Sequence, residues 1–100
     1  MIFEWDYSKD ILNRRKHGIS FDEARRVFDD KNALSILDEE HSSIDEERWI
    51  TIGNINSMNI ILVVHLIKDI NSVEHIRIIS ARKATKIETK QYFINQENIL

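Results

Sequence analysis

The chain has 100 residues, a formal net charge of −3 and no cysteine. A chain of this length forms one modest core, so we expect a single domain over residues 1–100. Without cysteine it has no disulfides or thiolate metal ligands, which fits a reducing cytoplasm. The N-terminus lacks the basic and apolar regions of a signal peptide, and the longest apolar run, Ile60–Ile67, is too short to span a bilayer. We therefore expect a cytoplasmic protein that does not enter a membrane.

Charge is spread unevenly along the chain. The segment Asp29–Glu47 holds eight acidic residues and one lysine, whereas Lys9–Arg26 holds six basic and three acidic residues. A net negative charge argues against indiscriminate nucleic-acid binding, but this distribution predicts two surfaces that suit different partners. The acidic segment is either a solvated loop or a contact for a basic partner.

A strand and two helices are predicted at the N-terminus. Ile2–Trp5 alternates apolar and polar side chains, which indicates a short strand. Asp6 is a suitable N-cap for a helix over Tyr7–Lys16, and Gly18 has the position of a residue that ends a helix in the left-handed conformation.

The second helix is predicted from the capping box of Ser20 and Glu23 to about Phe28. Its apolar residues fall on one stripe, which indicates a core-facing side. This stripe consists of Phe21, Ala24, Val27 and Phe28.

Four strands are predicted to follow as a meander. They cover Ala33–Leu37, Glu47–Ile55, Asn59–Lys68 and Val73–Ser80. The run Asn59–Lys68 is apolar on both faces, which favours a central position. Helices ahead of a run of strands predict an α+β fold, in which an antiparallel sheet of four to five strands is packed on one face.

Strict alternation divides the strand Val73–Ser80 into two faces. One face holds Ile76, Ile78 and Ser80, and the other holds His75, Arg77 and Ile79. A basic turn, Ala81–Ala84, is predicted next. A second capping box, formed by Thr85 and Glu88, then predicts one C-terminal helix to about Asn95.

The sequence contains no recognisable metal or nucleophile motif. It has no HExxH, CxxC, glycine-rich phosphate loop or GxSxG, and zinc-type spacing is missing among its four histidines, His17, His41, His65 and His75. Proton transfer by histidine and charge stabilisation by arginine remain. His65 is either a general acid or base on a solvent-facing side of the central strand or a core histidine, and the residues alone leave both open.

Arginine clusters fit phosphate chemistry, because a planar guanidinium group binds phosphate oxygens bidentately. Cleavage of RNA by attack of a 2′-hydroxyl on the adjacent phosphate builds up negative charge that such groups stabilise. Arg48, Arg77 and Arg82 would meet on one sheet face if the strands of Arg48 and Arg77 flank the central one. The alternative is that Arg77 and His75 simply face water.

Four segments stand out together. They are FEWDYSKDILNRRKHGISFDEA near the N-terminus, VFDD over Val27–Asp30, ERWITIG over Glu47–Gly53 and RIISARKATKIE over Arg77–Glu88. In this order they resemble the BrnT family of bacterial type II toxins. The resemblance implies a RelE-like ribonuclease fold, an RNA substrate and no metal cofactor. It also implies a BrnA-like DNA-binding antitoxin that neutralises the toxin, and a toxin dimer within the complex.

The resemblance also suggests roles for the matching residues. It implies that Arg77 and Arg82 are catalytic and stabilise the phosphate and the transition state, with His65 or His17 as the group that transfers protons. The implied RNA-binding and phosphate-binding residues are Arg48, Ser80 and Lys83. His17 could instead cap the first helix through its C-terminal carbonyl groups.

The sequence therefore predicts the toxin component of a type II toxin-antitoxin system. Its activity would be that of a metal-independent endoribonuclease that cleaves RNA by 2′-hydroxyl attack and inhibits translation. The rival hypothesis is a non-catalytic module that keeps the fold, binds the antitoxin and acts only as a transcriptional corepressor.

Overall fold

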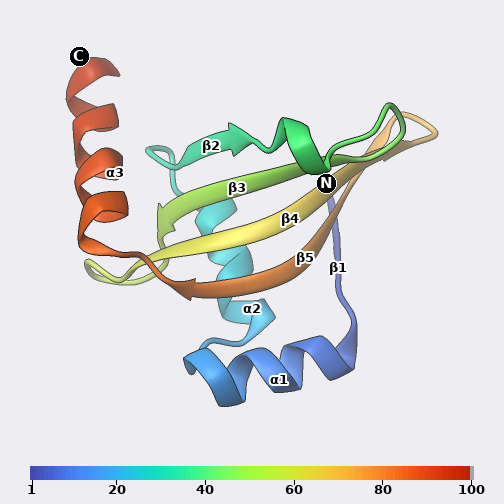
Figure 1. Cartoon of the computed structure of the whole chain (residues 1–100), viewed down its shortest axis with the longest axis horizontal. Helices are drawn as coiled ribbons and strands as arrows, with labels where there is room; N and C mark the ends of the chain where they lie inside the picture. Colours follow the sequence, from blue (N-terminus) through green and yellow to red (C-terminus); the bar gives the residue numbers. More distant parts are fainter. Residues whose placement is uncertain (100) are drawn as a thin grey trace.

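A computed structural model describes the backbone of residues 1–99 and the side chains of residues 1–96. It contains one five-stranded sheet with helices against both faces and along one edge (Figure 1). The predicted α+β class is confirmed. In chain order, with η for a 3-10 helix, the elements are β1 (Ile2–Glu4), α1 (Tyr7–His17), α2 (Phe21–Ala24), η1 (Arg25–Asp29), β2 (Leu34–Leu37), η2 (Glu39–His41), β3 (Glu47–Asn54), β4 (Ile60–Ile70), β5 (Val73–Lys83) and α3 (Lys86–Ile99).

The strands lie in the order β1-β5-β4-β3-β2, so β2 to β5 form the predicted antiparallel meander with β4 in the centre. The expectation of an antiparallel sheet is wrong at one edge. There β1 pairs parallel with β5, from Ile2 opposite His75 to Glu4 opposite Arg77. A hairpin turn forces antiparallel pairing, but no hairpin joins β1 to β5, so nothing local fixes their relative direction.

Both strands of the β4–β5 hairpin are longer than predicted. The turn is only Asn71 and Ser72, whose φ angles of 53° and 65° suit a tight two-residue connection. At its other end β5 continues to Lys83, so the predicted turn Ala81–Ala84 is wrong. The reason is that β4 begins at Ile60 and offers pairing partners to the last residues of β5.

The predicted limits of α1 are confirmed by its caps. The Asp6 carboxylate accepts hydrogen bonds from the amides of Ser8 and Lys9, at 2.8 and 3.2 Å. Gly18 adopts a left-handed φ of 71°, and its N–H donates to the Arg14 carbonyl. Since other side chains rarely adopt this φ, a glycine is needed where the chain turns back towards the sheet.

Asn13 of α1 joins this helix to the free edge of β5. Its side-chain amide donates to the carbonyls of Ile19 and Ala81, both at 2.9 Å, and its oxygen accepts from the Ala81 N–H at 3.1 Å. Because β1 ends opposite Arg77, the edge of β5 at Ala81 has no neighbouring strand. Asn13 thus supplies the hydrogen bonds that a longer β1 would have made.

The core lies between α2, η1 and one face of the sheet. The Ser20–Glu23 capping box is present, but the α-helix ends at Ala24 and continues as the 3-10 helix η1. Of the predicted stripe, the members Phe21, Ala24 and Val27 are fully buried, against Ile61, Val63 and Ile78 of β4 and β5 among others. The predicted core side of this segment is confirmed.

The helix α3 packs on the opposite face of the sheet, so the expectation of packing on one face is wrong. Tyr92 is 3% exposed and lies in a cluster with Ile52 and Leu62. Its hydroxyl donates to the Asp30 carboxylate at 2.6 Å, which ties α3 to the segment before β2. The helix runs beyond the predicted end, to Ile99, and Leu100 lies outside the described residues. Within residues 1–99, no helix is both long and apolar enough to cross a membrane.

We expect Asn13→Ala to lower the free energy of unfolding by about 2–3 kcal/mol, because it leaves buried backbone groups of Ala81 and Ile19 without partners. Chemical denaturation measures the change. The control is Leu12→Ala on the exposed side of α1, where Leu12 is 61% exposed and the cost should stay below about 0.5 kcal/mol. Equal stability of the two variants would contradict the role given to Asn13.

Candidate functional site: an arginine face of the sheet

An extra residue in β5 brings three polar side chains to one face of the sheet. Paired residues on neighbouring antiparallel strands project to the same side. Along the regular strand β4, Leu66 pairs with Arg77, Val64 with Ser80 and Leu62 with Arg82. The register shifts between Val64 and His65, where Ile79 of β5 is the unpaired residue of a bulge. Strict alternation placed Ser80 opposite Arg77, and the bulge makes that expectation wrong.

Arg48 joins this face from the other side of the central strand. It pairs with Leu66, which in turn pairs with Arg77, so Leu66 lies between the two arginines. The strands of Arg48 and Arg77 therefore flank β4, as predicted. We call the surface formed by Arg48, Arg77, Ser80 and Arg82 the arginine face.

Arg48 and Arg77, which lie on either side of Leu66, differ in their side-chain contacts. Arg48 Nε lies 3.5 Å from Asp38 Oδ2, and His41 Nδ1 contacts the same carboxylate oxygen at 2.9 Å. The hydrogen bond to His41 and the charge of Arg48 hold the pKa of Asp38 below its usual value. Arg77 is exposed, and no hydrogen bond or ion pair of its side chain is found within residues 1–96. Arg77 is therefore available to an anionic ligand.

Arg82 is held by a glutamate of α3. Its Nη1 and Nη2 donate to Glu88 Oε1 and Oε2 at 2.8 and 2.9 Å, a bidentate pair. The hydrogen bond from Arg82 lowers the pKa of Glu88 to about 2. It also raises the pKa of Arg82, so the pair stays ionised at any ordinary pH.

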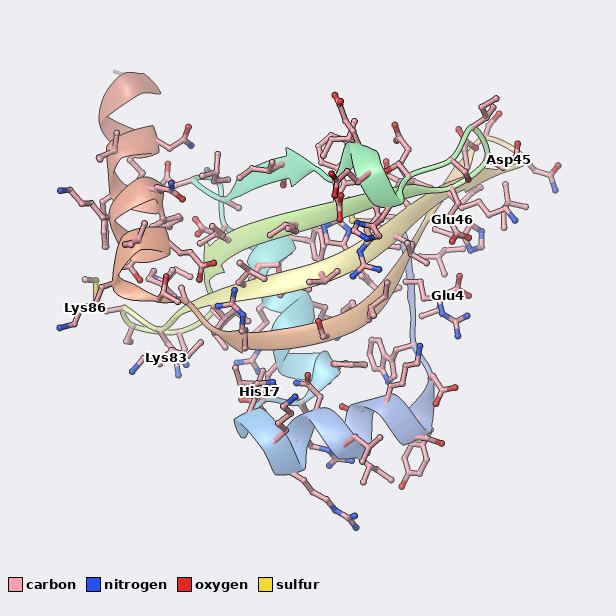
Figure 2. All side chains as sticks on the ribbon, in the orientation of Figure 1. Glu4, His17, Asp45, Glu46, Lys83 and Lys86 are labelled. Atoms are coloured by element: carbon pink, nitrogen blue, oxygen red, sulfur yellow. The ribbon has the colours of Figure 1, made fainter. Side chains whose placement is uncertain are left out.

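Lys83 and His17 lie near the arginine face without being part of it. Lys83 pairs with Ile61, whose side chain is in the core, so Lys83 begins on the opposite face of the sheet and is exposed. His17 is exposed at the last turn of α1, one helical turn beyond Asn13 on the same side. Since Asn13 binds Ala81, this turn lies beside the end of β5 that carries Arg82 and Lys83. Figure 2 shows His17 towards the same end of the molecule as Lys83.

His65 lies on the helix-covered face, away from the arginines. It is 1% exposed, its ring centroid lies 4.8 Å from that of Phe28 in an edge-to-face arrangement, and its Nε2 shares a hydrogen bond of 2.8 Å with the Thr51 hydroxyl. Burial lowers the pKa of His65 from its usual 6.5 to about 4, so the imidazole is neutral at pH 7. The structure does not bring His65 together with Arg77 and Arg82, because regular alternation along β4 turns its side chain towards the core.

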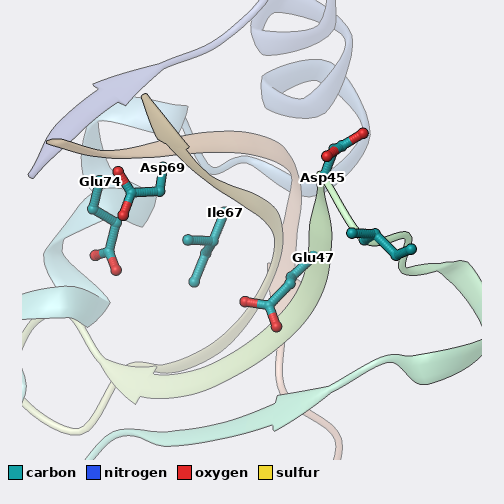
Figure 3. A pocket seen from close by; sticks show the side chains of 6 residues that line it. Asp45, Glu47, Ile67, Asp69 and Glu74 are labelled. Carbon is teal, nitrogen blue, oxygen red and sulfur yellow. The ribbon is translucent and has the colours of Figure 1, made fainter. Parts of the chain in front are cut away.

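The end of the molecule opposite Lys83 and Lys86 is acidic. Figure 3 shows side chains around a cavity of about 360 Å³, lined by Ile44, Asp45, Glu47, Ile67, Asp69 and Glu74. Four of these six residues are carboxylates and none is basic, so the cavity repels a polyanion. Figure 2 places Asp45 and Glu46 at one end of the longest axis and Lys83 and Lys86 at the other.

Among the described residues, no three histidines or carboxylates gather in a way that could hold a metal ion.

Sequence reasoning missed two residues that support the site. Glu88 was recognised only as part of a capping box, although the same carboxylate also reaches Arg82. Arg82 and Glu88 are six positions apart in the sequence. They come into contact only because of the direction that the chain takes between the end of β5 and the start of α3. Asn13 gave no signal, because a polar residue within a basic helix usually faces water, whereas here it is 7% exposed.

The fold and the arginine face define a small α+β protein with three arginines on one face of its sheet, a set of side chains suited to a phosphate backbone. A comparison with family models matches residues 5–88 to the BrnT toxin family, described as a ribonuclease toxin of type II toxin-antitoxin systems. The chain belongs to this family, and the resemblance seen in its sequence segments is confirmed. Membership implies an RNA target and an antitoxin partner. A comparison with curated proteins finds no match.

The buried His65 predicts a specific pH dependence of stability. The pKa of His65 is lower in the folded chain than in the unfolded one, so protonation of His65 favours the unfolded chain. Its contribution to the free energy of unfolding is therefore fully present above about pH 6.5 and is lost as the pH falls through about 4. The shift corresponds to a loss of up to about 3 kcal/mol. The free energy of unfolding, measured by denaturation at pH 7 and at pH 4, should decrease less for His65→Gln than for the wild type. The control His17→Gln, changed at an exposed site, should show the same decrease as the wild type. Identical pH profiles for all three proteins would contradict the prediction.

Proposed function

We propose that the chain is a toxin endoribonuclease that cleaves RNA by attack of a 2′-hydroxyl on the adjacent phosphate, without a metal ion. The observation that carries the proposal is the bulge of β5, because it aligns Arg77, Ser80 and Arg82 on one face of the sheet, where α3 covers only the part next to Leu62. RNA cleavage by this route concentrates negative charge on the phosphate oxygens. Guanidinium groups are the protein chemistry best suited to that charge.

The reaction exchanges one bond at phosphorus for another. The 2′-oxygen forms a bond to phosphorus while the bond to the 5′-oxygen breaks, and a proton passes from the 2′-hydroxyl to the leaving oxygen. The products are a cyclic phosphate and a 5′-hydroxyl end. In this proposal Arg77 and Arg82 stabilise the phosphate, and Arg48, Ser80 and Lys83 bind the flanking RNA.

The proton-transfer group that fits best is His17. It is exposed and lies beside the end of β5, whereas His65 is enclosed by the core and separated from the arginine face by the sheet itself. An exposed imidazole in contact with solvent can act as a general base and then as a general acid.

We also propose that the partner is a BrnA-like DNA-binding antitoxin, that toxin dimers occur in the complex, and that RNA cleavage inhibits translation in the cytoplasm. Family membership supports an antitoxin partner in general. The expectation that the acidic segment contacts a basic partner stays a prediction.

Replacing either arginine should abolish most of the activity. We expect Arg77→Ala and Arg82→Ala each to slow cleavage by about 10²- to 10³-fold, the usual cost of removing a preorganised charge-stabilising group. The measurement is cleavage of a defined RNA by the purified chain in EDTA, with analysis of the product ends. Wild-type protein should yield cyclic phosphate ends.

The control is Arg25→Ala. Arg25 pairs with Asp22 at 3.3 Å on the helix-covered side, so its loss should leave the rate within about twofold of the wild type. If the wild type binds an antitoxin but cleaves no RNA, the rival function of a non-catalytic corepressor module is correct. If cleavage requires an added metal ion, the proposed mechanism is wrong.

The two histidines can be separated by their effect on the rate. We expect His17→Ala to slow cleavage by at least about 10²-fold, since a positioned histidine typically contributes 10²- to 10⁴-fold. His65→Gln should cleave as fast as the wild type at pH 7.5 and a temperature at which both remain folded. Single-turnover cleavage rates of the two variants show which histidine transfers the proton. The opposite pattern would show that the proton passes through the buried histidine.

A further inference from the structure

The bidentate pair of Arg82 and Glu88 uses only part of the guanidinium group. A guanidinium group has five N–H donors, two on each Nη and one on Nε. Arg82 Nη1 donates to Glu88 Oε1 at 2.8 Å and also to the Lys83 carbonyl at 3.3 Å, while Nη2 donates once, to Glu88 Oε2 at 2.9 Å. Within the described residues, the Nε–H and the second Nη2 hydrogen therefore have no partner. These two donors form one edge of the group, the edge that can bind a phosphate bidentately.

Glu88 is itself fixed at the start of α3. Its Oε1 accepts the Thr85 N–H at 2.9 Å, and its own N–H donates to the Thr85 hydroxyl at 3.2 Å. This capping box locks the carboxylate to the backbone at the point where β5 passes into the helix. Glu88 is well covered, with a side chain 21% exposed, whereas Arg82 is 40% exposed. A partly exposed ion pair adds little to stability, so its main physical effect is to restrict the rotamers of Arg82.

We propose that Glu88 is a positioning residue for RNA cleavage: it binds the end of the Arg82 guanidinium and turns the free Nε–Nη2 edge towards the phosphate on the arginine face. The inference rests on the proposed function and deepens it. In this proposal α3 acts on catalysis through its capping box, by way of Arg82.

The proposal predicts that Glu88→Ala affects RNA binding and the chemical step in opposite directions. Glu88→Ala removes a negative charge beside the RNA, so the KM for RNA should stay the same or fall. The same change releases Arg82 to other rotamers, so kcat should fall about tenfold or more. Glu88→Gln keeps one acceptor for Arg82 and should retain part of the activity. If Glu88 instead acted as a competitor that RNA must displace, both alanine and glutamine variants would cleave faster than the wild type.

The test is single-turnover and steady-state cleavage of one defined RNA by the purified full chain and its variants. The matched control is Glu23→Ala, because Glu23 forms the other capping box, with Ser20, and pairs with no arginine among the described side chains of residues 1–96. Thermal unfolding of both variants shows whether either capping box is needed for folding. Glu23→Ala should keep the wild-type kcat, and Glu88→Ala should not.

A double-variant cycle decides whether Glu88 acts through Arg82. In the Arg82→Ala background, Glu88→Ala should cause no further loss of kcat, because the group that it positions is already absent. An unchanged or higher kcat for Glu88→Ala, with Arg82→Ala inactive, overturns this inference and leaves the proposed function intact. A full and additive loss in the double variant assigns Glu88 a purely structural role and also overturns it. Equal cleavage rates for wild type and Arg82→Ala overturn the role of Arg82 and this inference with it, whereas a wild type that cleaves no RNA overturns the proposed function itself.

Discussion

The single unpaired residue in β5 is the constraint on which the site depends. A strand without a bulge turns side chains five positions apart to opposite faces, so Arg77 and Arg82 would lie on different sides of the sheet. With Ile79 unpaired, both arginines and Ser80 project from one side, while Ile76, Ile78 and Ala81 still reach the core. One strand therefore contributes Ile76, Ile78 and Ala81 to the core on one face and keeps polar side chains on the other.

The hydrogen bonds of Asn13 make this arrangement possible. Beyond the bulge, β5 runs past the end of β1, and its outer backbone groups would be exposed next to the core. A side-chain amide replaces the missing strand at Ala81, and this fixes the last turn of α1 against the end of the sheet. The last turn of α1 and the start of α3 thus both contact the end of β5, α1 through Ala81 and α3 through Arg82.

Local signals in the sequence were sufficient for most elements of the fold. The caps of Asp6, Gly18 and Ser20 are interactions between residues close in sequence, so the pattern of residue types defines them. The parallel pairing of β1 and the bulge depend on which strands meet, and no local pattern encodes that. The same distinction holds for the site. Arg77 and Arg82 were predicted as residue types, whereas their common face and the role of Glu88 depend on register and on the path of the chain after Lys83.

A net charge of −3 is an unusual property for a protein that acts on RNA, and the geometry of the fold removes the difficulty. The longest dimension of the molecule is 36 Å, and the labelled carboxylates Asp45 and Glu46 lie at the opposite end from Lys83 and Lys86 (Figure 2). Electrostatic fields in physiological salt decay over a Debye length of about 8 Å, so each end of the molecule is screened from the other. An approaching polyanion is affected by the local potential, not by the sum over the chain. The protein would turn in the field of the RNA so that its cationic end leads, and this orientation would be reached before any contact forms.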